Sequence, residues 1–199
     1  MANEDTVASH QATVSQTAGP YFHIGLSRLF TDQVADADAF GRHIVVEGRV
    51  LDGDGVPVTD ALIEIWQADP NGKYAHPDDL DDMKGKSRTP GFRGFARVPS
   101  NDDGFFRFTT VKPGRVSAPA GAKQAPHILV SVFMRGLLRQ VVTRLYFSDE
   151  PSNEEDLVLG SVPAQRRSTL IAKRRTGQPD VFDWNIVLQG PHETAFFDY

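Results

Sequence analysis

A histidine at the start of an apolar run is the residue of this sequence best placed for metal chemistry. A loop rich in proline, glycine and alanine, residues 113–126, leads into a run that begins at His127. Because alternate side chains of a β-strand point to the same face, His127 and Leu129 are expected to be neighbours. A His-x-His metal pair needs a second imidazole, and leucine stands at that position. The local pattern therefore predicts one candidate ligand and no complete pair.

Four short motifs carry a resemblance to a known family. They are Tyr74 after the Asn71-Gly72 turn, Lys112-Pro113-Gly114, Ala125-Pro126-His127-Ile128 and Thr143-Arg144-Leu145-Tyr146-Phe147. Together they resemble the intradiol ring-cleaving dioxygenases, with similarity over residues 13–199. The resemblance implies a non-haem ferric ion held by two tyrosines and a His-x-His pair.

Only half of that ligand set is present in this chain. Tyr74 matches the first tyrosine and His127 the first histidine, whereas Val116 and Leu129 stand where the second tyrosine and second histidine belong. Catalytic metal sites use at least three protein ligands, and neither valine nor leucine has a lone pair to offer. We therefore expect no metal and no catalytic residue here. Tyr74 is expected to be a core or turn aromatic, and His127 a buried, hydrogen-bonded histidine in a vestigial pocket.

This departure resembles the iron-free alpha subunit of the two-chain members of the family. The resemblance implies a homologous beta subunit that holds Fe(III), a hetero-oligomer of αβ pairs, and an active site that both chains build. It also implies a substrate, protocatechuate, which O2 opens between its two hydroxyl-bearing carbons to give 3-carboxy-cis,cis-muconate in the beta-ketoadipate pathway. The isolated chain is expected to be inactive.

The resemblance also implies residues that contact this substrate. It places Thr17, Gly19 and Pro20 along the partner's active site, and Arg135 near the shared pocket. The planar fork of an arginine suits a carboxylate. The alternative is that Arg135 is a solvent-facing hairpin arginine, with Arg139 or Arg144 as competitors for the substrate. Arg144 lies within a strand motif where a structural ion pair is the expected role.

Composition excludes several classes of protein. The chain has 199 residues and a net charge of −5, with no basic run, so nucleic acid is an unexpected partner. It has no cysteine, which excludes disulfides and thiolate metal sites. The first nineteen residues lack an apolar signal region, and no segment is long enough to span a membrane. We expect a cytoplasmic protein with an arm at residues 1–12, disordered or ordered by a partner, and one domain at 13–199.

The periodicity predicts an all-β, antiparallel β-sandwich with long loops and one short helix. Strands are expected at 43–51, 61–66, 105–111, 127–134, 138–147 and 181–188. The Asp52-Gly53-Asp54-Gly55 turn should join the first two as a hairpin, because Pro57 makes it a poor calcium loop. The helix is expected at 163–174, with Ser161 as its N-cap. Residues 17–21 should form a turn before the first strand, and 76–82 a solvated acidic face within a long loop.

Three functions remain open at this stage. The first is the iron-free subunit of a two-chain dioxygenase, and the second is an autonomous ring-cleaving enzyme, which the two lost ligands disfavour. The third is a non-enzymatic β-sandwich that acts as a binding module. This third reading explains the strands but not the family match at residues 16–21 and 193–199. We therefore favour the subunit.

Overall fold

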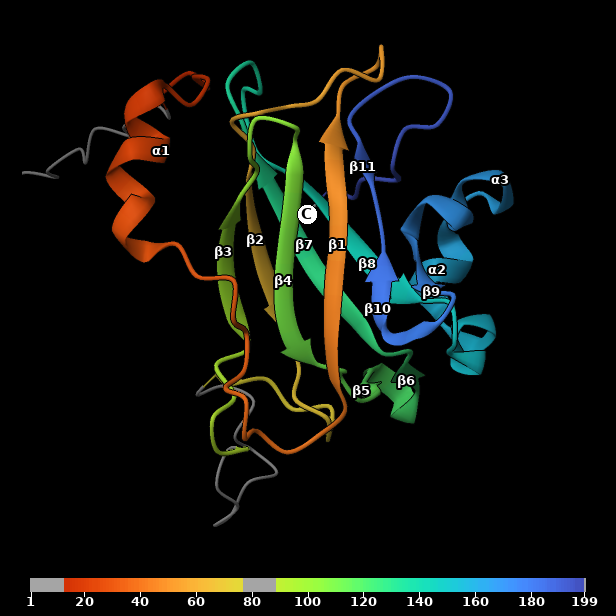
Figure 1. Ribbon diagram of the computed structural model, residues 1–199. Helices are drawn as coiled ribbons and strands as arrows, with labels where there is room; N and C mark the ends of the chain where they lie inside the picture. Colours follow the sequence, from red (N-terminus) through yellow and green to blue (C-terminus); the bar gives the residue numbers. More distant parts are fainter. Residues whose placement is uncertain (1–12, 77–88, 199) are drawn as a thin grey trace, which may run out of the picture.

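A computed structural model describes residues 13–76 and 89–198 of the chain. Eleven β-strands carry most of the regular structure of this part. Figure 1 shows most of them as two facing layers, whereas β5 and β6 form a separate two-stranded sheet at one end. The strands are β1 (His43–Leu51), β2 (Leu62–Gln67), β3 (Phe95–Pro99), β4 (Phe105–Val111), β5 (Val116–Ser117), β6 (Lys123–Gln124), β7 (His127–Phe133), β8 (Val141–Phe147), β9 (Ile171–Arg175), β10 (Gln178–Asp183) and β11 (Ile186–Val187).

Short helices lie at the ends and edges of the sandwich. They are α1 (Pro20–Leu26), η1 (Ser27–Leu29), η3 (Pro119–Gly121), η4 (Pro151–Glu155), α2 (Leu157–Ser161), α3 (Ala164–Arg167) and η5 (Ser168–Leu170). α1 stands at one side of the sandwich, and α2 and α3 lie at the opposite side (Figure 1). No helix of the described part of the chain has the length and apolar character needed to cross a bilayer.

Each layer contains four strands that pair with their neighbours in the layer. One contains β3, β2, β7 and β8, all antiparallel, and the other contains β4, β1, β10 and β9. β8 and β9 join the layers through a short parallel pairing in which Tyr146 lies opposite Ile171. β1 is also parallel to β10 and β11. The predicted all-β sandwich is confirmed, and these parallel pairs interrupt its otherwise antiparallel pairing.

The core lies between the layers because each strand turns alternate apolar side chains inward. β7 contributes Ile128, Val130 and Val132 to it, and β4 contributes Phe106 and Phe108. His127 and Leu129 consequently lie on the outer face of β7. A second apolar cluster packs there under α2 and α3, formed by Ala125, Tyr146, Leu159, Val162, Leu170 and Ala195.

Two local predictions were wrong because tertiary pairing overrides local propensity. The expected helix at 163–174 is α3, η5 and then strand β9, and residues 13–76 and 89–198 contain three short α-helices instead of one. Arg175 of β9 is held across the sheet by Glu47 and Asp183, which favours the extended form. Ser161 is not an N-cap: its hydroxyl donates to the carbonyl of Val158 at the end of α2.

Two further local predictions need correction. The turn at 52–55 exists, with Asp52 Oδ1 accepting from the backbone of Asp54 and Val56. It returns the chain to the end of β1 through an isolated bridge between Leu51 and Pro57, but it does not join β1 and β2 as a hairpin. β1 pairs with β4, β10 and β11, whereas β2 pairs with β3 and β7 in the other layer. Residues 17–21 lead into helix α1, with Pro20 at its first turn, where the missing N–H of proline costs nothing.

The remaining strand predictions agree with the structure. The hairpin of β7 and β8 is joined near Arg135 and Gly136, as predicted, and β4 covers the predicted range. The expected strand at 181–188 is divided into β10 and β11, with Phe182, Trp184 and Ile186 buried in alternation. The break follows from the close approach of Trp184 to β1, whose Glu47 carbonyl accepts from Trp184 N at 2.8 Å.

Candidate functional site

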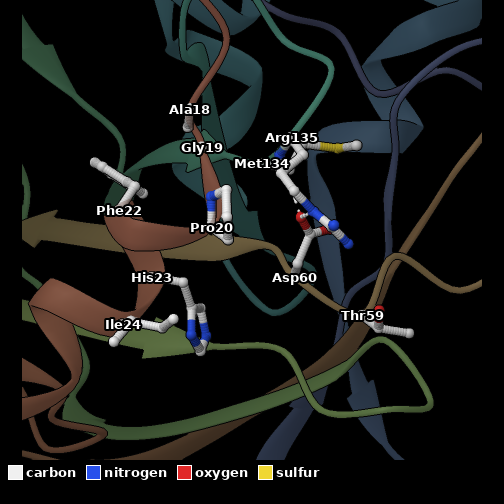
Figure 2. Close-up of a pocket in the computed structure, with 10 residues that line it drawn as sticks. All are labelled: Ala18, Gly19, Pro20, Phe22, His23, Ile24, Thr59, Asp60, Met134 and Arg135. Carbon is white, nitrogen blue, oxygen red and sulfur yellow. Dashed lines mark hydrogen bonds and ion pairs between the residues drawn. The ribbon is translucent and has the colours of Figure 1, made fainter.

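A hollow of about 240 Å³ lies where three distant parts of the chain meet. The N-terminal segment 18–24 forms one wall, Thr59 and Asp60 form a second, and Met134 and Arg135 form the third (Figure 2). Gly19, Pro20 and Arg135, three of the four predicted substrate contacts, line this hollow. Thr17, the fourth, lies at the rim of the hollow, where it forms a hydrogen bond with the β7–β8 hairpin turn.

Two polar contacts hold the three walls together. The hydroxyl of Thr17 accepts from the backbone N–H of Gly136 at 2.6 Å and ties the N-terminal segment to the β7–β8 turn. Asp60 Oδ2 accepts from Arg135 Nε at 2.5 Å and from Arg135 N at 3.3 Å. Among the described residues the two terminal nitrogens of Arg135 make no hydrogen bond. The guanidinium is therefore fixed at one edge and open at the other.

The Gly19-Pro20 step offers an open and apolar wall. A Cβ added to Gly19 would meet no atom of the described chain within 4 Å, and its φ of −85° suits any residue. Helix α1, which begins at Pro20, has no buried residue, and Tyr21 and Ile24 are among its exposed apolar side chains. This wall therefore faces outward with little of the chain's own structure against it.

Two further residues of the hollow were not predicted from the sequence. His23 Nε2 is sealed from solvent and has no hydrogen-bond partner among the described residues, and its ring packs edge-on to Phe30 at 5.0 Å. Asp60 lies in a turn, and nothing in its local sequence marks it as a partner of a residue 75 positions away. Only the fold brings Asp60 to Arg135.

The competing arginines lie elsewhere. Arg139 is 75% exposed, pairs with Asp198 at 2.8 Å, and borders an adjoining hollow beside Phe22 and Leu138. Arg144 lies on β8 and donates to Gln124 Oε1 at 2.6 Å, on the outer face of the sandwich. Arg135 is the one arginine of the three that lines the hollow at Gly19 and Pro20.

The four positions that the family resemblance predicts to correspond to iron ligands lie in one neighbourhood on the outer face of β7. Tyr74 stacks on Trp66 with ring centroids 5.8 Å apart, and Trp66 lies opposite Leu129 across β2 and β7. Leu129 in turn lies opposite Arg144, whose partner Gln124 pairs with Val116 in the β5–β6 hairpin. We call these four residues, Tyr74, Val116, His127 and Leu129, the ligand-position cluster.

His127 serves the structure of this cluster. It is buried, and its Nδ1 lies 2.8 Å from the carbonyl oxygen of Ala125, so that nitrogen carries the proton and donates. Burial lowers the pKa of His127, the bond to Ala125 opposes that shift, and the nearby Arg144 cation lowers the pKa further. The imidazole is consequently neutral, and it packs against the ring of Tyr146 at 5.8 Å.

A buried carboxylate supports the same neighbourhood. Asp156 accepts from Ala125 N at 2.7 Å, from Val158 N and Leu159 N at 2.9 and 2.8 Å, and from the hydroxyl of Tyr146 at 3.1 Å. It thereby caps α2 and holds the chain just before His127. Burial and the nearby Asp156 charge raise the pKa of the Tyr146 hydroxyl, so this phenol stays protonated. Every acceptor position of the carboxylate has a structural task.

The ligand-position cluster does not fit a ferric ion. Val116 and Leu129 supply no donor atom, and the cationic guanidinium of Arg144 lies close enough to His127 to lower its pKa. In residues 13–76 and 89–198 no three His, Cys, Asp or Glu side chains gather in a way that could hold a metal. His76 contacts Trp66, while the rest of the acidic stretch expected at 76–82 lies outside the described residues.

Comparison with known proteins places the chain in a family. A family model described as "Dioxygenase" matches residues 18–190. The chain is 46% identical to the protocatechuate 3,4-dioxygenase alpha chain of Burkholderia cepacia, over 94% of this chain and 96% of the relative. The chain belongs to the intradiol dioxygenase family.

More distant members of the family agree with this placement. The dioxygenase chain is 32% identical to the protocatechuate 3,4-dioxygenase beta chain of Burkholderia cepacia, over 90% of its own length and 77% of the relative. The structure of an intradiol ring-cleavage dioxygenase from Tetranychus urticae superposes with a TM-score of 0.62 at 18% identity, covering 84% of this chain and 89% of that one. The latter likeness supports the sandwich fold alone.

Proposed function

We propose that this dioxygenase chain is the alpha subunit of a protocatechuate 3,4-dioxygenase, and that a homologous beta subunit holds the Fe(III). The assembled enzyme uses O2 to open protocatechuate between its hydroxyl-bearing carbons, giving 3-carboxy-cis,cis-muconate for the beta-ketoadipate pathway. Two relatives, 46% and 41% identical to this chain, carry the names of such alpha chains, and a beta chain is itself a relative. In this proposal the chain contributes binding groups to a shared active site and no catalytic residue.

The proposal rests on a difference between two regions of the chain, the ligand-position cluster and the hollow at Arg135. The ligand-position cluster has two apolar residues where donors are needed, so this cluster cannot activate O2 by the family's chemistry. The hollow at Gly19, Pro20 and Arg135 keeps an arginine edge directed to open space. A chain that has lost its metal ligands but keeps an outward-facing binding surface suits a subunit that completes its partner's site.

Arg135 is proposed to bind the carboxylate of protocatechuate. Its terminal nitrogens remain available for a carboxylate, because its Nε is already held by Asp60 at 2.5 Å. A guanidinium matches the two oxygens of a carboxylate in one plane, and a charge-assisted hydrogen bond is stronger than a neutral one. Arg135 would orient the ring of the substrate from the end opposite to its hydroxyl groups.

The segment 17–20 is proposed to form the wall beside the substrate ring. Pro20 offers a rigid apolar edge, and the open space at Gly19 leaves room for an aromatic ring or for partner backbone. Thr17 fixes this wall to the turn that carries Arg135. The wall would keep water from the ring while Arg135 holds the carboxylate.

The surface around this segment suits a permanent partner. Val14, Tyr21, Ile24, Leu29 and Leu138 are large apolar residues that the isolated chain leaves exposed. A permanent complex of this kind typically buries roughly 2,000 Å² or more in total. We propose that the beta subunit covers this surface in αβ pairs. The arm expected at residues 1–12 lies outside the described residues.

A co-expression experiment tests the proposed division of labour. The chain is purified alone and together with a homologous beta chain, and iron content, colour and activity are measured. We expect an intensely coloured, active complex, and a colourless alpha chain without stoichiometric iron. About one tightly bound iron per isolated alpha chain would contradict the proposal. A stable monomer that does not bind the beta chain would also contradict it.

A second experiment tests the carboxylate contact. Arg135→Ala should lower kcat/KM for protocatechuate by about ten- to a hundred-fold, the effect of losing a charge-assisted hydrogen bond worth roughly 1.5 to 3 kcal/mol. Catechol, which lacks the carboxylate, should lose much less. Arg139→Ala is the matched control, since that arginine is exposed and paired with Asp198. Equal losses on both substrates would mean that Arg135 supports the fold or the interface.

A truncation tests the wall formed by the N-terminal segment. Removing residues 1–21 should impair turnover more than assembly, because it deletes Thr17, Gly19 and Pro20 but leaves the sandwich core. Assembly is measured by light scattering and turnover by oxygen uptake. Unchanged kinetics in the truncated complex would refute the contact between this segment and the active site.

A further inference from the structure

We propose that Asp60 is a positioning residue that selects for substrates with a carboxylate by holding Arg135 in its binding orientation. This inference rests on the proposed function, because it assigns the task of a second residue at the same shared site. Asp60 does not touch the substrate in this proposal. It acts through the guanidinium, which it holds from the side away from the open edge.

Asp60 binds Arg135 at two points, and we call this arrangement the clamp. One oxygen of Asp60 accepts from both the backbone N–H and the side-chain Nε–H of Arg135, at 3.3 and 2.5 Å. The arginine side chain is 62% exposed, whereas that of Asp60 is 25% exposed. An arginine this exposed would otherwise sample many rotamers, and each would have to be given up when a ligand binds. The aspartate removes that freedom before the substrate arrives.

Because Asp60 occupies one edge of the Arg135 guanidinium, only the other edge remains for a ligand. A guanidinium can bind a carboxylate through Nε and one terminal nitrogen, or through its two terminal nitrogens. Asp60 takes Nε and leaves the terminal pair, as Figure 2 shows for the arrangement of Arg135 and Asp60 at the hollow. The carboxylate of Asp60 also offsets part of the arginine's charge. Binding then depends on a ligand that matches the remaining edge, and not on negative charge alone.

The turn that carries Asp60 is itself anchored. Its flanking residues Val58 and Ala61 are buried, and both are tied to the buried side chain of Ser100. The Ser100 hydroxyl donates to the carbonyl of Val58 at 2.8 Å and accepts from Ala61 N at 3.0 Å. Ser100 N also donates to the carbonyl of Ala61 at 2.8 Å. Asp60 therefore stands on backbone that is fixed on both sides, as a preorganised binding group requires.

The turn of Arg135 has a second anchor besides the bond from Arg135 N to Asp60. The backbone of Gly136 is bound by Thr17, and Gly136 has a φ of +93°, a conformation that glycine adopts without strain. Replacing Asp60 should therefore release the side chain of Arg135 while its backbone remains in place. This separation allows the role of Asp60 to be measured without loss of the site.

The test uses the assembled complex and two substrates. Asp60→Ala should raise KM for protocatechuate by about five- to thirty-fold and leave kcat within about twofold. The variant weakens substrate binding but does not alter the groups that react. KM for catechol should not change. Asp60→Asn, which keeps an oxygen that can accept from Nε, should restore KM for protocatechuate to within about threefold of the native value.

A double variant separates positioning from other roles. In an Arg135→Ala background, Asp60→Ala should have no further effect on KM, since the two residues act as one unit. If the alanine variant does not assemble, Asp60→Ser replaces it, because serine suits the turn but is too short to hold Nε. Its KM for protocatechuate should rise by a similar factor.

The outcomes distinguish this inference from the proposed function. If Arg135→Ala is selective for protocatechuate but Asp60→Ala or Asp60→Ser leaves KM unchanged, the positioning role is wrong and the substrate contact stands. If Arg135→Ala is not selective, the substrate contact fails and the role of Asp60 fails with it. An equal rise in KM for catechol and protocatechuate in the Asp60 variants would assign Asp60 to the fold and overturn the inference.

Discussion

The ligand-position cluster and the hollow at Arg135 use their polar groups in opposite ways. In the cluster, Nδ1 of His127 is directed to the backbone of Ala125, and the neighbouring Asp156 has four donors of the chain's own structure. In the hollow, the terminal nitrogens of Arg135 and Nε2 of His23 have no partner among the described residues. One region directs its polar groups to the chain's own structure, and the other has polar groups that no described residue binds.

This difference indicates what remains when a catalytic fold loses its metal ligands. Buried polar groups must be hydrogen-bonded, so a former metal neighbourhood persists only where structural bonds satisfy them. An exposed arginine edge carries no such demand, and in the proposed function it is kept because it binds the carboxylate of the substrate. The comparison therefore predicts that variants in the cluster change stability, and variants at the hollow change turnover.

The largest effect on stability is expected at Asp156. Asp156→Ala removes the acceptor of three backbone N–H groups and the Tyr146 hydroxyl, and leaves these donors buried. Breaking such a network should cost about 3 kcal/mol or more of unfolding free energy. Urea denaturation of the complex measures it. Asp198→Ala, at an exposed carboxylate, should change stability by less than about 0.5 kcal/mol. A loss below about 1 kcal/mol in Asp156→Ala would contradict the structural role.

A smaller effect is expected from acidification, through His127. Burial lowers the folded-state pKa of His127 below its ordinary value of 6.5, so the unfolded chain binds a proton more readily. Stability should be unaffected by this residue above pH 6.5, and should fall by up to about 1.4 kcal/mol per pH unit as the pH drops from 6.5 toward the lower folded pKa.

Chemical denaturation at a series of pH values checks this slope. His127→Gln should flatten this slope below pH 6.5. Asp149, whose pKa is lowered by Lys112 and Arg42 against the opposing effect of burial, makes a separate contribution. That contribution is present above the ordinary aspartate pKa and is lost as the pH falls through the lowered value. A slope that survives His127→Gln would mean that another group takes up the proton.

The smallest effect on stability is expected at the hollow. Gly19→Ala adds a methyl group to open space at an ordinary φ, so unfolding free energy should change by less than about 0.5 kcal/mol. Turnover of protocatechuate by the complex should nevertheless fall several-fold, because the methyl group enters the space proposed for substrate or partner. Gly160→Ala is the matched control, since its Cβ also meets nothing and it lies in α2. Equal activity in both variants would show that the space at Gly19 has no function.

The alternation of side chains was readable from the sequence, and it determined most strands. The burial of Ile128, Val130 and Val132, and the placement of His127 and Leu129 on the other face, follow from a period of two. The sequence alone also shows that Val116 and Leu129 cannot be metal ligands. A valine or leucine side chain has no donor atom in any fold. The family motifs added the placement of Arg135 beside residues 17–20 as an expectation.

Only the tertiary structure decided the pairing of elements and the partners of exposed charges. Residues 171–175 look helical by local charge, but they pair with β8 and β10, and Glu47 and Asp183 hold Arg175 in extended form. The bond from Gly136 to Thr17 and the clamp of Arg135 by Asp60 join residues 119 and 75 positions apart. Such contacts depend on where distant backbone segments lie once the core has packed. Local propensity carries no information about that arrangement.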